Sequence, residues 1–376
     1  MAVELSLGGE SARATGRLWR HAPWHVLLVA LVIAGLGVWN LMSASRVAPA
    51  PLWRSQLSWI GIGLVVALLI MVVDYRHLLS LAYPVYGFVV LLLLAVLLKG
   101  HAAMGARRWL DFGPMHLQPS ELMKIAIILV LARFYHEDDR HKEGYSLYHL
   151  WLPALLIVVP VALVMKQPDL GTAMMIAAIA GSMVLFGKVR WKSIAILVAV
   201  FVAGASMAWT HVLKDYQKRR VTSFLDPEAD MLGSGYHASQ SLIALGSGQG
   251  WGKGWGQGTQ AQLSFLPEQH TDFIFSVWGE EHGFLGTSML LLVYLLLVLL
   301  AIGVAAGARE KFGTFIAVGV CSMLFWHVFI NIGMVTGTLP VVGVTLPLMS
   351  YGGSSVLTIL VGLGLLMNVG MRRHLF

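Results

Sequence analysis

Long apolar segments alternate with short polar ones along most of this 376-residue chain. Ten of these runs approach or exceed the roughly 20 residues that a helix needs to cross a bilayer. They lie at residues 24–44, 57–73, 81–98, 119–134, 150–165, 170–186, 194–209, 273–304, 315–335 and 354–369. The pattern predicts an all-α polytopic membrane protein with about ten transmembrane helices and one long extracytoplasmic loop.

The composition excludes a water-soluble globule. Hydrophobic residues make up 57% of the chain and charged residues 12%, whereas soluble domains are about a quarter charged. The single cysteine, Cys321, excludes an intrachain disulfide. The first apolar run follows Arg13, Arg17 and Arg20 and is too long for the core of a signal peptide, so we expect it to be retained as a span.

Lysine and arginine are distributed unequally between the two ends of the predicted spans. Fourteen lie on the side that carries both termini, against six in the short loops of the other side. The positive-inside rule therefore places both termini in the cytoplasm. The expected organisation is a cytoplasmic tail (1–23), transmembrane helices 1 to 7 (24–212), a long extracytoplasmic loop (213–272), transmembrane helices 8 to 10 (273–370) and a cytoplasmic tail (371–376).

The long loop is the unusual feature of this layout, because structureless connections beyond about 15 residues are uncommon unless they are functional. It contains a possible amphipathic stretch, 236–245, and a glycine-dense segment, 246–258, with Trp251 and Trp255. Tryptophans beside a membrane usually lie at headgroup level, so we expect this loop on the outer face of the bilayer. The glycines could wrap a phosphate, but no GxxxxGK[ST] motif is present, which favours a flexible turn.

Asp272 directly precedes an apolar run, where water gives way to hydrocarbon. One interpretation is a helix N-cap, worth about 0.5 to 2 kcal/mol. The other is a general base whose pKa is raised by partial desolvation. The two interpretations shift the pKa in opposite directions, and the sequence leaves both open.

Other charged residues also lie within or beside apolar runs. Glu121 and Lys124 are three residues apart, hence on one helix face; because burying either alone costs several kcal/mol, we expect them to pair or to line a wet cavity. Asp169 most simply caps the run that follows it. Glu280 and Glu281 lie two turns inside their run, where a structural network and a proton path are both open.

The predicted extracytoplasmic side carries several lysine and arginine residues but few side chains that could bind a metal ion. Lys218, Arg219, Arg220 and Lys253 lie in the long loop. His270 is a weak candidate metal ligand, and the sequence assigns no metal site. No basic stripe with interleaved aromatics occurs outside the membrane-flanking loops, so nucleic acid is not an expected partner.

The uncharged loop 337–354 has two prolines among small residues and is expected to be a re-entrant segment packed inside protein.

Five blocks of sequence, in order, resemble the SEDS (shape, elongation, division and sporulation) polymerases over nearly the whole chain. They are 118–121 (QPSE), 168–172 (PDLGT), 224–228 (FLDPE) running on to 235–237 (GYH), 265–275 (FLPEQHTDFIF) and 347–354 (PLMSYGGS). The resemblance implies a ten-helix inner-membrane glycosyltransferase that polymerises lipid II, the undecaprenyl-pyrophosphate-linked disaccharide peptide, into peptidoglycan for cell elongation. It also implies a class B penicillin-binding protein as the partner that cross-links the strands.

The resemblance also implies roles for particular residues. Asp272 matches the family's essential acidic residue, and Glu121 and Lys124 match its buried ion pair. Asp169 and Arg220 match other positions of importance. The remaining candidates for binding substrate or supporting the site are Lys218, Lys253, Glu268 and His270. Lys218 stands where many members have arginine, so no arginine-specific phosphate contact is expected from it.

The residues suit transfer from a pyrophosphate leaving group, which needs one base and several cations rather than the two carboxylates of a glycosidase. In this hypothesis Asp272 deprotonates the acceptor 4-hydroxyl, which attacks the donor anomeric carbon with inversion. Arg220, Lys253 or a divalent cation (Mg²⁺ or Mn²⁺) holds the pyrophosphate, and no other cofactor is expected. The alternatives are a lipid II flippase and a non-catalytic scaffold for the transpeptidase.

Overall fold

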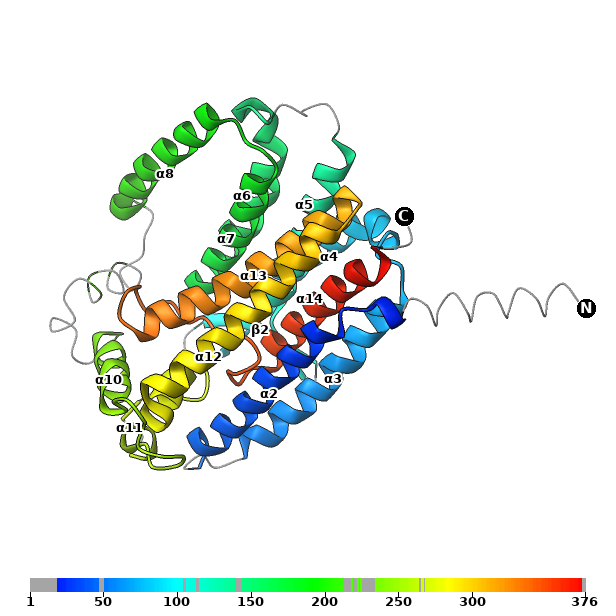
Figure 1. Ribbon diagram of the computed structural model, residues 1–376. Helices are drawn as coiled ribbons and strands as arrows, with labels where there is room; N and C mark the ends of the chain where they lie inside the picture. Colours follow the sequence, from blue (N-terminus) through cyan, green and yellow to red (C-terminus); the bar gives the residue numbers. More distant parts are fainter. Residues whose placement is uncertain are drawn as a thin grey trace, which may run out of the picture.

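The computed structural model describes residues 19–46, 51–103, 106–112, 115–138, 144–211, 234–263, 265–266 and 268–373, together with Lys218, Thr222 and Phe224. Helices dominate this part of the chain (Figure 1). Their bounds are α2 Trp24–Ala44, α3 Leu52–Val72, α4 His77–Lys99, α5 Pro119–Glu137, α6 Trp151–Lys166, α7 Leu170–Phe186, α8 Trp191–His211, α10 Ser234–Ser247, α11 Thr259–Gln262, α12 Ile274–Gly307, α13 Lys311–Val335 and α14 Gly353–Arg372. A 3-10 turn, Leu147–Leu150, leads into α6.

Each predicted apolar run coincides with a helix. The ends of α2 and α7 agree with the prediction residue for residue, and the largest difference is five residues, at the start of α3. In the described residues, seven helices are long and apolar enough to cross a membrane, with α7 and part of α8 as shorter apolar helices. The chain is therefore a helical, multi-span membrane protein. The count of ten spans stays a prediction, since α5 is charged and α7 is short.

A small antiparallel sheet between α4 and α5 was not predicted. Its strands are β1 His101–Ala103, β2 Ala106–Phe112 and β3 Met115–Leu117, in the order β1-β2-β3. The strands are too short for a period-2 signal to stand out from the apolar runs beside them. From β2, Arg108 donates a hydrogen bond to the carbonyl of Pro168, just before α7. The sheet therefore covers the end of the bundle where α7 begins.

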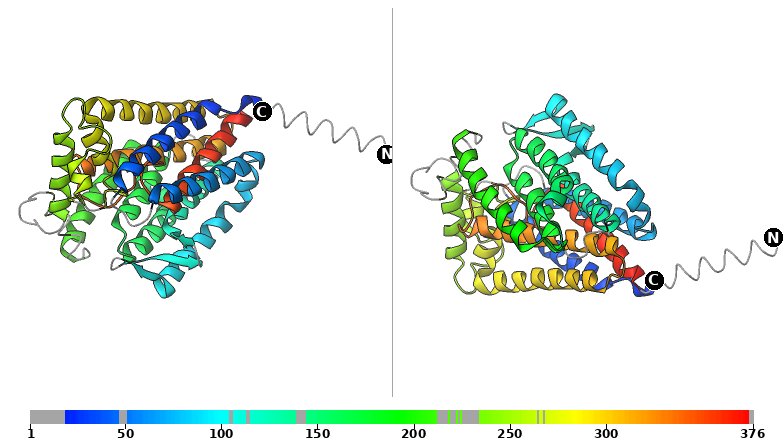
Figure 2. Two further views of the ribbon diagram at one scale, coloured as in Figure 1. Left: turned by 90° about the horizontal axis from the view of Figure 1, so that it is seen from below. Right: turned by 90° about the horizontal axis from the view of Figure 1, so that it is seen from above.

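Three helices are mostly buried and form the centre of the bundle: α5, α13 and α14. α14 packs against α3, while α13 packs against α5, α7 and α12 (Figures 1 and 2). α2 lies along α12, and α10 packs against the first turns of α12. α8 lies at the edge of the molecule in Figure 1. The charged helix α5 is thus shielded by its neighbours, which allows ionisable side chains at membrane depth.

The glycine-dense segment packs against a kink in α12. At Gly283 the backbone leaves the helix (φ 65°, ψ −163°), and the N–H groups of Phe284 and Leu285 donate to the carbonyls of Gln249 and Gly250. A Cβ on Gly252 would lie 2.2 Å from the carbonyl oxygen of Glu281. The segment forms a turn, and its glycines serve close packing, because side chains do not fit between the two backbones.

The last loop, between α13 and α14, lies inside the protein as predicted. Val342, Val344, Leu346 and Met349 are buried. The hydroxyl of Tyr294 donates to the Pro347 carbonyl at 2.7 Å. Non-helical backbone in a membrane protein needs such partners, since lipid supplies none. This loop, residues 336–352, is called the buried loop below.

Candidate functional site

Asp272 lies where the long loop enters α12, and it is half-buried. The N-cap position of α12 is Phe273, and its N–H donates to the Glu268 carbonyl at 3.3 Å. The helix thus begins one residue later than a cap by Asp272 requires, so the N-cap interpretation is wrong. The carboxylate faces the buried loop: a Cβ on Gly343 would lie 3.2 Å from Asp272 Oδ2.

The backbone around Asp272 is tied to the buried loop at several points. The amide of Asn331, in α13, donates to the carbonyls of Asp272 (2.8 Å) and Val344 (2.7 Å). The hydroxyl of Ser350 donates to the Thr271 carbonyl at 2.6 Å. The bonds to residues 272 and 271 span 59 and 79 positions of the chain, and they restrain the backbone that carries Asp272.

Glu268 and His270 lie in the same turn as Asp272. Glu268 has a positive φ of 50°, which is uncommon for a residue with a side chain, and its carboxylate accepts from the Thr271 hydroxyl at 3.0 Å. The carbonyl of His270 accepts from the N–H of Tyr351 at 2.8 Å. These contacts of Glu268 and His270 shape the turn that presents Asp272.

Asp169 caps α7, as its simpler interpretation predicted. Its carboxylate is 3% exposed and accepts from the Thr172 N–H (3.2 Å), the Thr172 hydroxyl (2.9 Å) and the Gln118 amide (3.0 Å). Two residues on, a Cβ on Gly171 would lie 2.6 Å from the Val342 carbonyl oxygen. The start of α7 therefore abuts the same loop that faces Asp272.

Asp169→Ala is expected to lower the free energy of unfolding by about 0.5–2 kcal/mol, because α7 loses its cap. Asp169→Asn retains an oxygen that can accept from the Thr172 N–H and should cost less. Unfolding midpoints of the detergent-solubilised protein measure both effects. Equal stability of wild type and Asp169→Ala would mean that the cap is unimportant.

The expected pairing of Glu121 with Lys124 is confirmed, and a third residue joins it. Lys124 is 1% exposed, and its Nζ lies 2.7 Å from Glu121 Oε1 and 2.9 Å from His327 Nε2. His327 Nδ1 lies 3.0 Å from the Thr345 carbonyl oxygen. Because a carbonyl only accepts, Nδ1 carries the proton and Nε2 accepts from the ammonium. The pair is thereby linked to the buried loop.

His327 and Asn331 were not singled out from the sequence, although a signal for them exists. They are polar residues four apart within an uncharged apolar run, which places them on one face of a helix. Polar side chains inside a span usually face protein partners. That rule identifies them as polar contacts of α13 but does not say what they contact.

Glu280 and Glu281 belong to a second cluster, at the kink of α12. Glu280 is fully buried, and its Oε1 lies 2.6 Å from Lys253 Nζ and accepts from the Thr259 hydroxyl at 3.1 Å. Glu281 accepts from the hydroxyl of Ser43 at 2.5 Å. Of the two open interpretations, these contacts favour a structural network that anchors the glycine-dense turn.

The remaining candidates are only partly described. Lys218 is half-buried, whereas Arg220 and its neighbour Arg219 lie outside the described residues. In the part of the chain that the structure describes, no three His, Cys, Asp or Glu side chains gather as a metal site.

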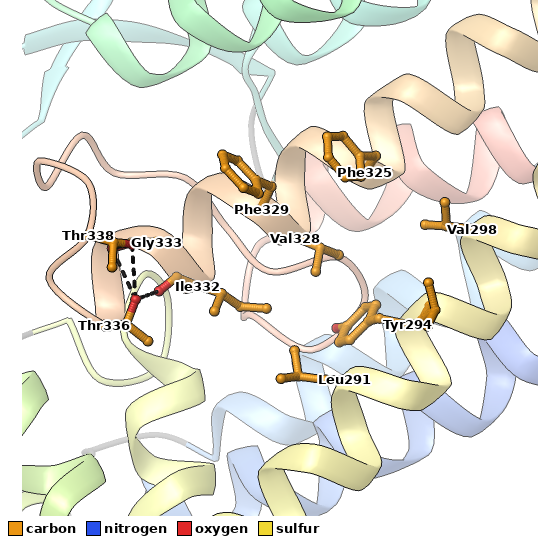
Figure 3. Close-up of a pocket in the computed structure, with 11 residues that line it drawn as sticks. Leu291, Tyr294, Val298, Phe325, Val328, Phe329, Ile332, Gly333, Thr336 and Thr338 are labelled. Atoms are coloured by element: carbon orange, nitrogen blue, oxygen red, sulfur yellow. Dashed lines mark hydrogen bonds between the residues drawn. The ribbon is translucent and has the colours of Figure 1, made fainter.

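An apolar groove of about 300 Å³ lies between α12 and α13 (Figure 3). Its walls include Leu291, Val298, Phe325 and Phe329, and its lining residues contain no charged side chain. Such a surface suits hydrocarbon and supplies no cation for a pyrophosphate. The groove is therefore not a candidate for binding a pyrophosphate.

The fold and this site define a class: a multi-span membrane protein with a half-buried carboxylate at one end of its bundle. The chain belongs to the FtsW/RodA/SpoVE cell cycle protein family, whose profile matches residues 22–375. It is 42% identical over 355 residues to the peptidoglycan glycosyltransferase MrdB of Escherichia coli K12, covering 93% of each chain.

Two solved structures resemble the fold closely. The first comes from work on the structural coordination of polymerization and crosslinking by a peptidoglycan synthase complex. It has a TM-score of 0.81 at 34% identity, and the match covers 94% of this chain and 98% of that one. The other is the rod shape determining protein RodA of Thermus thermophilus, with a TM-score of 0.70 at 32% identity, covering 95% and 99%. These likenesses extend over the whole bundle.

Proposed function

We propose that this chain is a peptidoglycan glycosyltransferase that polymerises lipid II into glycan strands for cell elongation. The observation that carries the proposal is the Asp272 carboxylate, half-buried against the buried loop at Gly343. It occurs in a chain 42% identical to a protein named as a peptidoglycan glycosyltransferase.

In the proposed reaction Asp272 acts as the general base. It takes the proton of the acceptor 4-hydroxyl while that oxygen attacks the anomeric carbon of the donor. The bond from the anomeric carbon to the pyrophosphate breaks, undecaprenyl pyrophosphate leaves, and the configuration inverts. A positioned base contributes about 10²- to 10⁴-fold to such a rate.

The leaving pyrophosphate needs positive charge. We assign this role to Arg220 and Lys218, or to a divalent cation (Mg²⁺ or Mn²⁺), which would supply positive charge to the leaving group. For Lys253 we propose a supporting role, because its ammonium already contacts Glu280 and the Thr259 hydroxyl. Glu121 and Lys124 support the site through His327 and the buried loop.

The proposed orientation puts both termini in the cytoplasm of a bacterium with an inner membrane, and Asp272 on the periplasmic side. The excess of Lys and Arg on the terminal side supports it. A class B penicillin-binding protein is the proposed partner, in keeping with the synthase complex whose structure resembles this chain.

The decisive experiment incubates the purified chain with lipid II and separates the products on a gel. Glycan polymer is the expected result. A flippase would instead move lipid II across liposomes without making polymer, and a scaffold would do neither. The flippase has little support from Glu121 and Lys124, because their charges are engaged by each other and by His327. Absence of polymer under conditions that support polymerisation by MrdB would overturn the proposal.

A further inference from the structure

Asn331 connects two segments that are distant in sequence. It is fully buried in α13, and its side-chain nitrogen lies 2.8 Å from the carbonyl oxygen of Asp272 and 2.7 Å from that of Val344. Both partners are carbonyl oxygens, which only accept, so the NH₂ end of the amide must face both. One side chain thus uses its two N–H groups to hold the end of the long loop to the buried loop.

The carboxylate of Asp272 borders the same contact. Gly343, next to Val344, has a φ of 78°, and a Cβ there would lie 3.2 Å from Asp272 Oδ2. The loop therefore approaches the carboxylate with bare backbone in a conformation that favours glycine. With no side chain between them, the spacing of carboxylate and loop depends on how the two backbones are joined.

We propose that Asn331 is a positioning residue for Asp272, setting the carboxylate relative to the buried loop. The inference rests on the proposed function, since it assigns a role in the same site. Asn331 acts through Asp272 and does not need to touch substrate. One turn earlier on α13, His327 contacts the carbonyl of Thr345, so the same helix face holds two consecutive residues of the loop.

The test compares the kinetics of Asn331→Leu with those of the wild-type chain in the lipid II assay. Leucine has the same number of side-chain heavy atoms, branched at the same carbon, but no donors, so both carbonyls lose their partner. A misplacement of about 1 Å can cost about 10²-fold in rate. We expect kcat to fall about 10- to 100-fold while KM for lipid II stays within about threefold, because substrate binding is not what Asn331 provides.

Asn368 offers a matched control at the opposite end of the bundle. It is also fully buried, and its amide nitrogen lies 2.5 Å from the Ile70 carbonyl oxygen and 2.6 Å from that of Val73. Asn368→Leu should lower the unfolding midpoint as Asn331→Leu does, but leave kcat within about twofold of wild type. If kcat fell in both variants, the loss at Asn331 would reflect general destabilisation of the bundle, and the inference would be overturned.

Asn331→Ser carries the test if the leucine variant does not fold. Serine is smaller and retains one O–H donor. The kcat of Asn331→Ser should therefore lie between the values of wild type and Asn331→Leu, at about tenfold below wild type. A folded serine variant with wild-type kcat would overturn the positioning role. That failure is separable from failure of the proposed function, because Asp272→Asn would then still be inactive.

Discussion

Asp272→Asn is expected to reduce polymerisation of lipid II by about 10²- to 10⁴-fold, the contribution of a positioned general base. The amide has nearly the shape of the carboxylate but cannot accept the hydroxyl proton at neutral pH. The hydrogen bond from Asn331 to the backbone carbonyl of residue 272 does not involve the side chain of residue 272 and should persist. Initial rates of polymer formation by the purified variant measure the effect.

A carboxylate at the other end of the bundle supplies the control. Glu310 pairs with Arg76 at 2.7 Å in a partly exposed site and also accepts from the Tyr75 hydroxyl at 3.1 Å. Glu310→Gln should polymerise at a rate within about twofold of wild type, since it weakens contacts at that end of the bundle only. The variant Asp272→Asn must also remain folded and bind the proposed penicillin-binding protein partner. Wild-type activity of folded Asp272→Asn would rule out the proposed base.

Lys124→Met is expected to lower the free energy of unfolding by about 3–5 kcal/mol, which is typical when a buried ion pair loses one partner. Glu121 is 7% exposed, and without the ammonium its charge stays in a poorly solvated site. His327 also loses the donor to its Nε2. Chemical or thermal unfolding in detergent measures the loss.

The double variant Glu121→Gln and Lys124→Met should recover much of that stability, because it leaves no uncompensated charge. Glu310→Gln serves again as the exposed comparison, with an expected loss of no more than about 1 kcal/mol. If Lys124→Met were as stable as Glu310→Gln, the buried pair would not stabilise the bundle.

The positions of the helices could be predicted because a membrane imposes them. In lipid each backbone polar group must be satisfied within its own segment, so an apolar run of sufficient length becomes a helix. α2 and α7 accordingly begin and end at the predicted residues. Contacts within one helical turn could also be anticipated from the sequence. The spacing of Glu121 and Lys124 places them on one helix face, and Asp169 contacts Thr172, which is only three residues away.

Features with weak local signals were not predicted. The sheet 101–117 consists of strands of three, seven and three residues, too short to show their period beside long apolar runs. The kink of α12 depends on Gly283 meeting a turn that lies about 30 residues earlier. In sequence, Gly283 is one glycine among 40.

For this protein, the sequence by itself determined the class of the fold and the position of each apolar helix, and it indicated the pairing of Glu121 with Lys124 and the cap by Asp169. Only the tertiary structure decided that Asp272 does not cap its helix, that His327 joins Lys124, that Lys253 meets Glu280 and that Asn331 joins residue 272 to residue 344. The physical reason is range. Helix formation depends on neighbours within one turn, whereas the contacts of a buried polar group are decided by packing between segments far apart in the chain.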